Sequence, residues 1–251
     1  MMIFGTKCDN ISISLAIKSA MDLVRIRKKA TILFLNADCL YKALKDEEYK
    51  NIINSADLVL SDGIGLKFAT NIFGEDIKDN CNGTDLSPLL MQKAAEDGYK
   101  IFFLGSEDIV AEKAAQNIGR KIAGIQIVGT HHGFFKNDEE VIKKINDSGA
   151  DILFVAMGVP RQEKWIAKHR EKLNPRLCLG VGALFDYLSG RIPRAPLFIR
   201  RIHLEWLWRI FIEPKRMIKR YIIDGTKLFW IILKCRVFSR NPSSTSAKSP
   251  N

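Results

Sequence analysis

The first 180 residues alternate short apolar runs with longer amphipathic segments. Each run carries β-branched or aromatic side chains and is followed within two residues by Gly, Ser or Asp, a pattern typical of buried parallel strands. The runs are Thr31–Asn36, Asp57–Leu60, Lys100–Leu104, Gln126–Val128, Ile152–Ala156 and Leu177–Leu179. The segments of helical length are Asp38–Asn54, Asp85–Asp97, Glu107–Ile122, Asp138–Asp147 and Arg161–Lys172. This order predicts an α/β fold with a doubly wound, mostly parallel, Rossmann-like sheet.

Charge divides the chain into two unequal parts. Residues 1–189 carry 25 basic and 25 acidic side chains, whereas residues 190–251 carry 14 basic and 3 acidic ones and hold the whole net charge of +11. We therefore expect an α/β catalytic body over residues 1–189 and a basic, aromatic-rich helical appendage over residues 190–238. Residues 239–251 are rich in Ser and Pro and are expected to be disordered.

The spacing of apolar residues in the appendage predicts one helix over Phe198–Phe211 and, after Pro214, a second over Lys215–Phe238. Three of the four tryptophans lie here among Lys and Arg. Basic and aromatic residues on helices too short to span a bilayer favour docking to an anionic membrane surface. Composition also allows a partner interface, including a homo-oligomer, or nucleic-acid binding.

The five cysteines are widely spaced and form no Cys-x-x-Cys motif, so we expect reduced thiols and neither a disulfide framework nor a zinc site. Polar residues Lys7, Asp9 and Asn10 interrupt any signal-peptide core. The longest apolar run near the C-terminus, Leu228–Leu233, is shorter than a membrane span. The expected location is therefore cytoplasmic, with the appendage on the membrane surface.

Ligands of parallel α/β sheets bind at the carboxyl ends of the strands. Asp62 follows one expected strand, where it serves either as an Asx turn or helix N-cap, or as a carboxylate general base. The turns at Gly105-Ser106 and Gly158-x-Pro160 have backbone N–H groups that suit a diphosphate.

Several motifs are missing from the sequence. Gly63-x-Gly65 and Gly180-x-Gly182 lack the third glycine of a dinucleotide site, and there is no P-loop, Gly-x-Ser-x-Gly or His-Glu-x-x-His. No Asp-x-Asp is present either, so a bound diphosphate is expected to be neutralised by cations and amides rather than by a metal ion. His131 and His132 are expected to point to opposite faces of a strand and not to share a metal.

Ten motifs occur in an order that spans most of the chain. They are Asn36–Asp38, Ser61–Gly65, Gly83–Leu86, Phe103–Ser106, Gly129–Phe135, Met157–Trp165, Gly180–Asp186, Gly190–Pro196, Leu204–Arg209 and Glu213–Arg216. Together they resemble the WecG/TagA/CpsF family of bacterial glycosyltransferases, in a match from about Asn36 to Tyr221. The resemblance implies an inverting, metal-independent enzyme without a cofactor.

The resemblance also implies the substrates. The donor is a UDP-sugar carrying N-acetylmannosamine or its uronic acid, and the acceptor is a polyprenyl-diphosphate-linked N-acetylglucosamine. The product belongs to a cell-surface polysaccharide or teichoic acid, made at the inner face of the cell membrane by a peripheral enzyme. Transfer of another UDP-hexose, or a non-catalytic nucleic-acid-binding role for the basic segment, is the alternative; we expect no nucleic-acid partner.

By the same resemblance, Asp62 is the base that deprotonates the acceptor. Gln162 resembles a donor-binding residue, Phe134 and Asp186 match positions near the nucleotide base, and Arg209 and Arg216 match arginines that hold the diphosphate. The remaining expected substrate-binding residues, all within matching motifs, are Asn36, Thr84, Asp85, Gly105 and Arg194.

Two positions depart from the family pattern. Phe34 stands where relatives often carry Thr in the cleft, which removes a hydroxyl contact and affects substrate preference. Lys219 stands where a third C-terminal arginine is usual. Lysine holds a phosphate as a point charge but does not grip it with two parallel hydrogen bonds.

Overall fold

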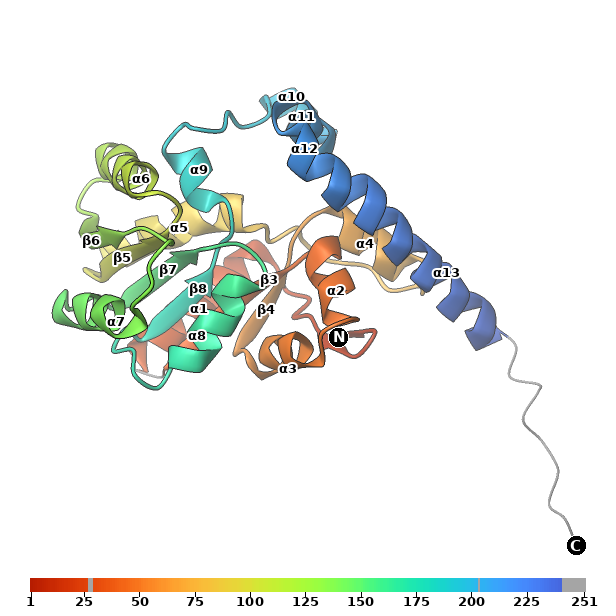
Figure 1. Ribbon diagram of the computed structural model, residues 1–251, viewed down its shortest axis with the longest axis horizontal. Coiled ribbons are helices and arrows are strands. Elements are labelled where there is room, and N and C mark those ends of the chain that lie inside the picture. Colours follow the sequence, from red (N-terminus) through yellow and green to blue (C-terminus); the bar gives the residue numbers. More distant parts are fainter. Residues whose placement is uncertain (27–28, 203, 241–251) are drawn as a thin grey trace, which may run out of the picture.

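The computed structural model describes residues 1–26, 29–202 and 204–240. Within the last helices, the side chains of Arg216, Arg220, Tyr221, Ile223 and residues 235–240 also lie outside the description. The described chain forms a six-stranded parallel sheet in the order β4-β3-β8-β7-β5-β6 (Figure 1). Its strands are β3 (Ala30–Leu35), β4 (Leu58–Ser61), β5 (Lys100–Gly105), β6 (Gln126–His131), β7 (Ile152–Ala156) and β8 (Leu177–Gly180).

Helices cover both faces of this sheet, which confirms the predicted doubly wound α/β fold (Figure 1). One face packs against α1 (Ile13–Arg25), α5 (Gly83–Glu96), α6 (Asp108–Lys121) and α9 (Leu184–Leu188). The other packs against α2 (Ala37–Ala43), α3 (Glu47–Ser55), α7 (Asp138–Asp147) and α8 (Arg161–His169).

Alternate residues of each strand enter different cores. In β5, Ile101 and Phe103 pack toward α1, α5 and α6, whereas Phe102 and Leu104 pack toward α7 and α8. Because both faces are covered, every position of β5 after Lys100 is buried, and the strand appears as a continuous apolar run rather than an alternating one.

Most predicted elements are confirmed, and β7 and α7 have the predicted bounds. The single helix predicted over Asp38–Asn54 is wrong, because α2 ends at Ala43 and α3 begins at Glu47. The break follows from Asp46, whose carboxylate accepts a hydrogen bond from the Tyr49 N–H at 3.0 Å and caps α3.

Three N-terminal elements were not predicted. The short strands β1 (Met2–Ile3) and β2 (Thr6–Lys7) form an antiparallel pair. Helix α1 follows, with Ser12 as its N-cap, and buries Ala16, Ala20 and Val24 against the sheet. The small alanines let this helix lie close to the strands, which a search for bulky apolar residues does not reveal.

The C-terminal segment leaves the body after α9 and crosses the carboxyl edge of the sheet (Figure 1). It comprises α10 (Leu197–Arg201), α11 (Glu205–Ile212), α12 (Pro214–Met217), a π-helical stretch (Ile218–Asp224) and α13 (Gly225–Arg240). The single helix predicted over Phe198–Phe211 is wrong, since α10 and α11 are separate. Residues 241–251, most of the predicted disordered tail, lie outside the described residues.

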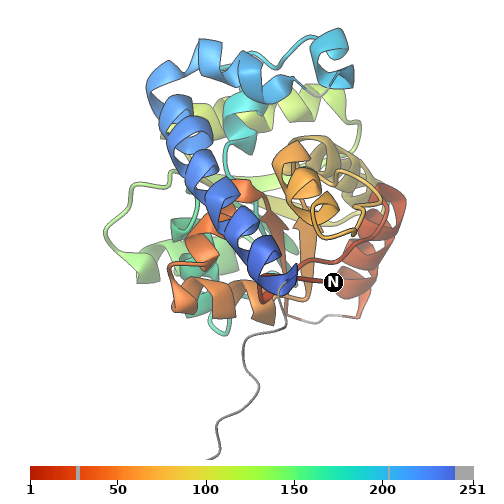
Figure 2. The same ribbon diagram turned by 90° about the vertical axis from the view of Figure 1, so that its right-hand side faces the viewer.

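Helix α13 runs diagonally across one side of the molecule, between α4 (Ile64–Asn71) and α2 (Figure 2). Its Leu228 and Ile232 are buried in the core beneath α2 and α3. Within the described residues, no helix combines the length and apolarity needed to cross a bilayer. The four described cysteines, Cys8, Cys39, Cys81 and Cys178, are buried and unbridged, as predicted.

Candidate active site

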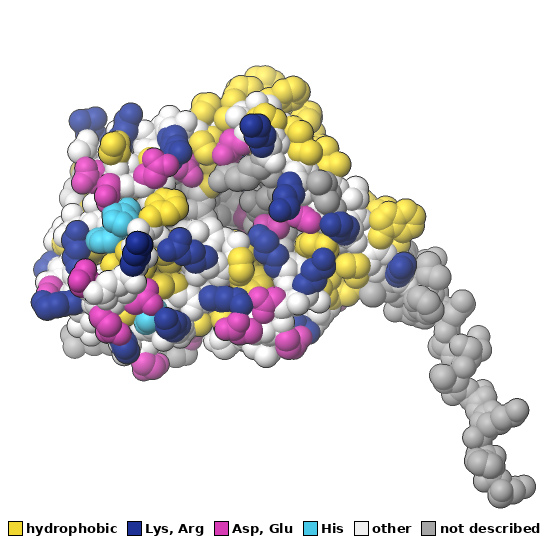
Figure 3. Space-filling view, viewed as in Figure 1, with side chains coloured by type: hydrophobic (Ala, Val, Ile, Leu, Met, Phe, Trp, Pro, Cys, Tyr) yellow, Lys and Arg dark blue, Asp and Glu magenta, His cyan; other side chains and the backbone are white. Residues whose placement is uncertain are grey.

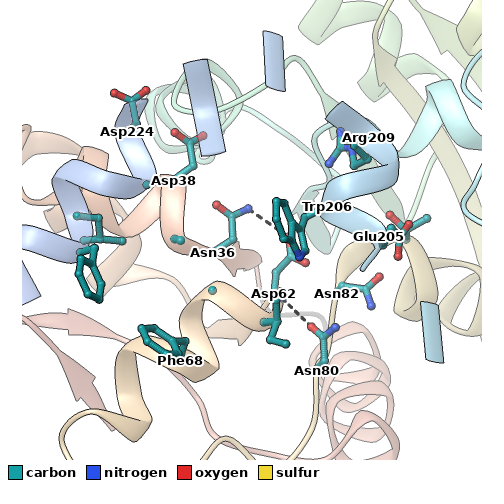
Figure 4. Close-up of a pocket in the computed structure, with 18 of the residues that line it drawn as sticks. Asn36, Asp38, Asp62, Phe68, Asn80, Asn82, Glu205, Trp206, Arg209 and Asp224 are labelled. Carbon is teal, nitrogen blue, oxygen red and sulfur yellow. Dashed lines mark hydrogen bonds between the residues drawn. The ribbon is translucent and has the colours of Figure 1, made fainter. Parts of the chain in front are cut away.

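A cleft runs along the carboxyl edge of the sheet in three connected lobes. The Phe68 lobe has a volume of about 500 Å³ and lies between the strand ends, α4, α11 and α13 (Figure 4). The Gln162 lobe, about 440 Å³, shares Asn36, Asp62 and Arg209 with it. The Phe134 lobe, about 490 Å³, shares Gly182 with the Gln162 lobe. The lobes therefore form one path, with Asp62 at the junction of the first two.

Asp62 follows β4 directly, and its N–H donates to the Leu35 carbonyl oxygen at 2.8 Å. Its carboxylate accepts a hydrogen bond from Asn36 Nδ2 at 3.2 Å (Figure 4). The N-cap of α4 is Gly63, with φ of +89°, and the Gly63 N–H donates to Asn80 Oδ1 at 2.7 Å. Asp62 is thus not the helix cap, and its carboxylate lines the cleft.

Three helices begin beside Asp62. Asn36 caps α2 by accepting from the Cys39 N–H at 3.0 Å, and Asn82 caps α5 by accepting from the Asp85 N–H at 2.9 Å. The third is α4, which begins just after Gly63. Helix N-termini carry partial positive charge, so this end of the cleft favours an anionic ligand.

Arg209 brings a cation to the cleft from α11. Its guanidinium lies over the Tyr187 ring, 5.6 Å from the ring centroid, and 3.9 Å from a Glu213 carboxylate oxygen. Its Nε atom is buried and has no hydrogen-bond partner among the described residues. Lys219 also lines the Gln162 lobe, as does Lys42, which pairs with Asp38 at 2.8 Å. The Arg216 side chain lies outside the described residues.

The Gln162 side chain is only 2% exposed and forms the floor of its lobe. Its Oε1 accepts from the Gly182 N–H at 2.9 Å, and its Nε2 donates to Glu163 Oε1 at 2.8 Å. Burial raises the pKa of Glu163 to about 7. Phe34 lines the same lobe at 8% exposure, with its ring beside Gly83. Thr84 borders both this lobe and the Phe68 lobe.

Phe134 and Asp186 both line the Phe134 lobe, and Phe134 is 69% exposed. The Phe134 N–H donates to His132 Nδ1 at 3.0 Å. The prediction that His131 and His132 point to opposite faces is wrong, because their rings lie 4.5 Å apart. Strand β6 ends at His131, so the alternation of a strand does not extend to His132. Ser106 Oγ donates to an Asp186 carboxylate oxygen at 3.4 Å.

Asp85, Arg194 and Gly105 line none of the three lobes. Asp85 forms an ion pair with Arg194 at 2.6 Å, which joins the C-terminal segment to the start of α5. Gly105 lies against the Ala156 backbone, and a Cβ there would be 2.3 Å from the Ala156 oxygen. The Ser106 N–H donates to that oxygen at 2.9 Å, so this turn is bonded within the fold.

The aromatic wall of the Phe68 lobe was not predicted. Phe68 of α4 stacks on Phe229 of α13 with ring centroids 6.3 Å apart, and Trp206 of α11 lies nearby (Figure 4). Aromatic residues on amphipathic helices were the available sign of this wall in the sequence. Whether their rings come into contact depends on how α13 crosses α4. Across the described residues, no three His, Cys, Asp or Glu side chains gather in a group able to hold a metal ion.

Comparison with known proteins agrees with the motifs. The family described as "Glycosyl transferase WecG/TagA/CpsF family" matches residues 1–242. The chain belongs to this family. It is therefore a glycosyltransferase, and the cleft is its candidate active site. The match begins before Asn36 and so includes the N-terminal elements that the motifs did not cover.

Named relatives support the same conclusion. An N-acetylglucosaminyldiphosphoundecaprenol N-acetyl-beta-D-mannosaminyltransferase of Bacillus spizizenii (strain ATCC 23059 / NRRL B-14472 / W23) is 34% identical over 87% of this chain and 84% of its own length. Proteins with the same name in Bacillus subtilis (strain 168) and Staphylococcus aureus (strain MRSA252) are 30% and 29% identical, each over 74% of this chain and 73% of their own.

Proposed function

We propose that this glycosyltransferase moves an N-acetylmannosamine-type residue, or its uronic acid, from a UDP-sugar to a polyprenyl-diphosphate-linked N-acetylglucosamine. The product is a precursor of a cell-surface polysaccharide or teichoic acid. The names of the relatives support the sugar and the acceptor. The observation that carries the proposal is the position of Asp62, where a lobe rich in glycine turns and cations meets a lobe with an aromatic wall.

The donor occupies the Phe134 and Gln162 lobes. Exposed Phe134 offers a ring for stacking on a nucleotide base, and Asp186 offers a hydrogen-bond acceptor. The diphosphate lies in the Gln162 lobe, near the start of α5 and close to Arg209 and Lys219. Arg209 Nε, buried and without a partner among the described residues, favours an anion there, since an unpaired buried polar group is costly.

The acceptor occupies the Phe68 lobe. Its diphosphate-linked sugar points toward Asp62, and its isoprenoid chain lies along Phe68 and Phe229, which offer apolar surface between α4 and α13. Apolar side chains also gather over the end of the molecule that carries α10 and α11 (Figure 3). This surface and the basic C-terminal segment suit an enzyme docked on the inner face of the cell membrane, where a lipid-linked acceptor resides.

The chemistry is a single displacement. The Asp62 carboxylate takes the proton of the acceptor hydroxyl while the hydroxyl oxygen forms a bond to the anomeric carbon of the donor. The bond from that carbon to the β-phosphate oxygen breaks, and its electron pair leaves with UDP. Attack from the face opposite the leaving group inverts the anomeric centre. Arg209 and the nearby helix N-termini stabilise the charge that grows on UDP, without a metal ion.

A transfer assay on the purified chain tests the proposal. The donors are UDP-N-acetylmannosamine, its uronic acid, UDP-N-acetylglucosamine and UDP-glucose, and the acceptor is a short-chain polyprenyl-diphosphate N-acetylglucosamine. We expect UDP release only when donor and acceptor are both present, an inverted linkage by NMR, and full activity in EDTA. Loss of activity in EDTA, a retained linkage, or transfer of glucose alone would contradict the corresponding part of the proposal.

A further inference from the structure

Two consecutive polar side chains are buried under the cleft at the start of α8. Gln162 and Glu163 are each only 2% exposed. Their helix turn is closed by the Gln162 N–H, which donates to the Gly158 oxygen at 3.0 Å. Gln162 fits tightly against β8, because a Cβ on Gly180 would lie 3.1 Å from Gln162 Nε2. Of the two residues, only Gln162 lines a lobe of the cleft.

Each end of the Gln162 carboxamide makes one hydrogen bond, its NH₂ group as the donor and its oxygen as the acceptor. Glu163 Oε1 accepts from Gln162 Nε2, and Gln162 Oε1 accepts from the Gly182 N–H. A carboxamide has one donor end and one acceptor end. If Gln162 were turned by 180°, its NH₂ group would face the Gly182 N–H and its oxygen would face the Glu163 oxygen. The acceptor supplied by Glu163 and the donor supplied by Gly182 therefore fix together which way Gln162 points.

Gly182 connects this pair to the cleft. It lies in the turn between β8 and α9, has φ of +56°, and lines both the Gln162 and Phe134 lobes. We propose that Glu163 is a positioning residue: it orients the Gln162 carboxamide, which holds the Gly182 N–H and fixes the turn against which the donor lies. This inference rests on the proposed function, which identifies the donor as a UDP-sugar.

Burial opposes the ionisation of Glu163, whereas the hydrogen bond from Gln162 favours its charged form. Desolvation is the main cause of its pKa of about 7, and its Oε2 atom has no hydrogen-bond partner among the described residues. Lys42 and Asp38 of α2 and Tyr49 of α3 are the ionisable groups that act on it. Lys42 favours the charged form and Asp38 disfavours it. A carboxylate accepts the Gln162 hydrogen bond more strongly than a carboxylic acid does, so the turn is held more firmly above pH 7.

Three variants separate the positioning role from packing. Glu163→Ala removes the acceptor, Glu163→Gln keeps an oxygen acceptor but does not ionise, and Lys164→Gln is a control on the same helix that lines no lobe. The first measurement is hydrogen exchange of the Gly182 amide in the full chain. We expect about tenfold faster exchange in Glu163→Ala, as for the loss of one hydrogen bond, and no change in the other two at pH 6.

The second measurement is the KM for the UDP-sugar. At pH 6 we expect a rise of about tenfold in Glu163→Ala, with kcat less affected and Glu163→Gln near the wild type. Between pH 6 and pH 8 the wild-type KM should fall about threefold, while that of Glu163→Gln stays flat.

Unchanged Gly182 exchange in Glu163→Ala would overturn the proposal. If Glu163→Ala does not fold, the pH comparison decides, and equal pH dependence of KM in the wild type and Glu163→Gln would overturn it. A wild type that binds no UDP-sugar would reject the proposed function instead, and the exchange measurement would still decide whether Glu163 positions Gln162 and Gly182.

Discussion

In the α/β body, apolar side chains are buried on both faces of the sheet, whereas many of those described in residues 190–240 are exposed. In the segment, the buried large apolar residues are Ile192, Met217, Leu228 and Ile232. The exposed ones include Phe198, Phe211 and Trp230. The body buries most of its apolar side chains in its own core, whereas much of the apolar surface described in the segment is exposed.

Charge shows the same division. The body is neutral and supplies the Asp62 carboxylate, and the segment is basic and supplies Arg209 and Lys219. The two meet at the Arg194–Asp85 ion pair and at the Phe68–Phe229 stack, and the cleft lies between them. The proposed base and the proposed cations for the leaving group therefore come from different parts of one chain.

We expect the greatest loss of turnover from a substitution in the body. Asp62→Asn removes the proposed base but keeps the side chain's shape, so we expect kcat to fall about 10³-fold with the dissociation constant for the UDP-sugar nearly unchanged. Steady-state turnover and calorimetric binding measure the two quantities. Asp76→Asn, in an exposed ion pair with Lys67, is the matched control and should keep full turnover. Full activity in Asp62→Asn would reject Asp62 as the base.

The next effect belongs to the segment. Arg209→Ala removes the buried cation, and we expect kcat/KM to fall about 100-fold because charge on the departing UDP is less stabilised. Arg209→Lys should recover part of the loss, since it restores a point charge without the guanidinium geometry. Rates measured with a short-chain acceptor exclude any contribution from membrane binding. Wild-type kcat/KM in Arg209→Ala would mean that Arg209 is not a catalytic cation.

A smaller effect concerns the membrane. Trp230 of α13 is 62% exposed. In Trp230→Glu we expect binding to anionic vesicles to weaken about tenfold. Turnover of a short-chain acceptor should be unchanged. Sedimentation with vesicles measures the binding. Ile109→Glu changes an apolar side chain of the body that is also exposed and should leave vesicle binding as in the wild type. Equal effects of the two variants would remove the distinction between body and segment.

The smallest effect concerns the joint between the parts. Asp85→Asn removes the ion pair with Arg194, and we expect kcat/KM to fall only about threefold, because partly exposed pairs contribute little. The measurement is again turnover of the short-chain acceptor. A loss as large as that of Arg209→Ala would instead place Asp85 in contact with substrate, as the family resemblance predicted.

Five of the six strands were predictable because they are buried on both faces and appear as apolar runs, whereas the edge strand β6 is only partly buried. The helix breaks were less accessible, since Asp46 was not recognised as the cap that separates α2 from α3. Helix α1 was missed because two of its four buried residues, Ala16 and Ala20, are small. These features depend on capping and close packing, to which a search for apolar runs is insensitive.

The candidate site was predictable where residues follow strands or begin helices. Asp62, Asn36 and Gln162 meet because the carboxyl ends of parallel strands share one edge. The aromatic wall of Phe68 and Phe229 was not foreseen, because it depends on how α13 crosses α4. The pairing of Asp85 with Arg194 is likewise a tertiary contact, which motif order alone does not contain.

In the proposed function the nucleotide lies in the body and the lipid lies between α4 and α13, on either side of Asp62. Photocrosslinking tests it directly, with an azido-uridine donor and an acceptor whose isoprenoid chain carries a benzophenone. Mass spectrometry should find the donor label on peptides around Phe134 and Asp186, and the lipid label on peptides around Phe68 and Phe229. Donor label on α4 or α13, or lipid label in the Phe134 lobe, would contradict this placement of the two substrates.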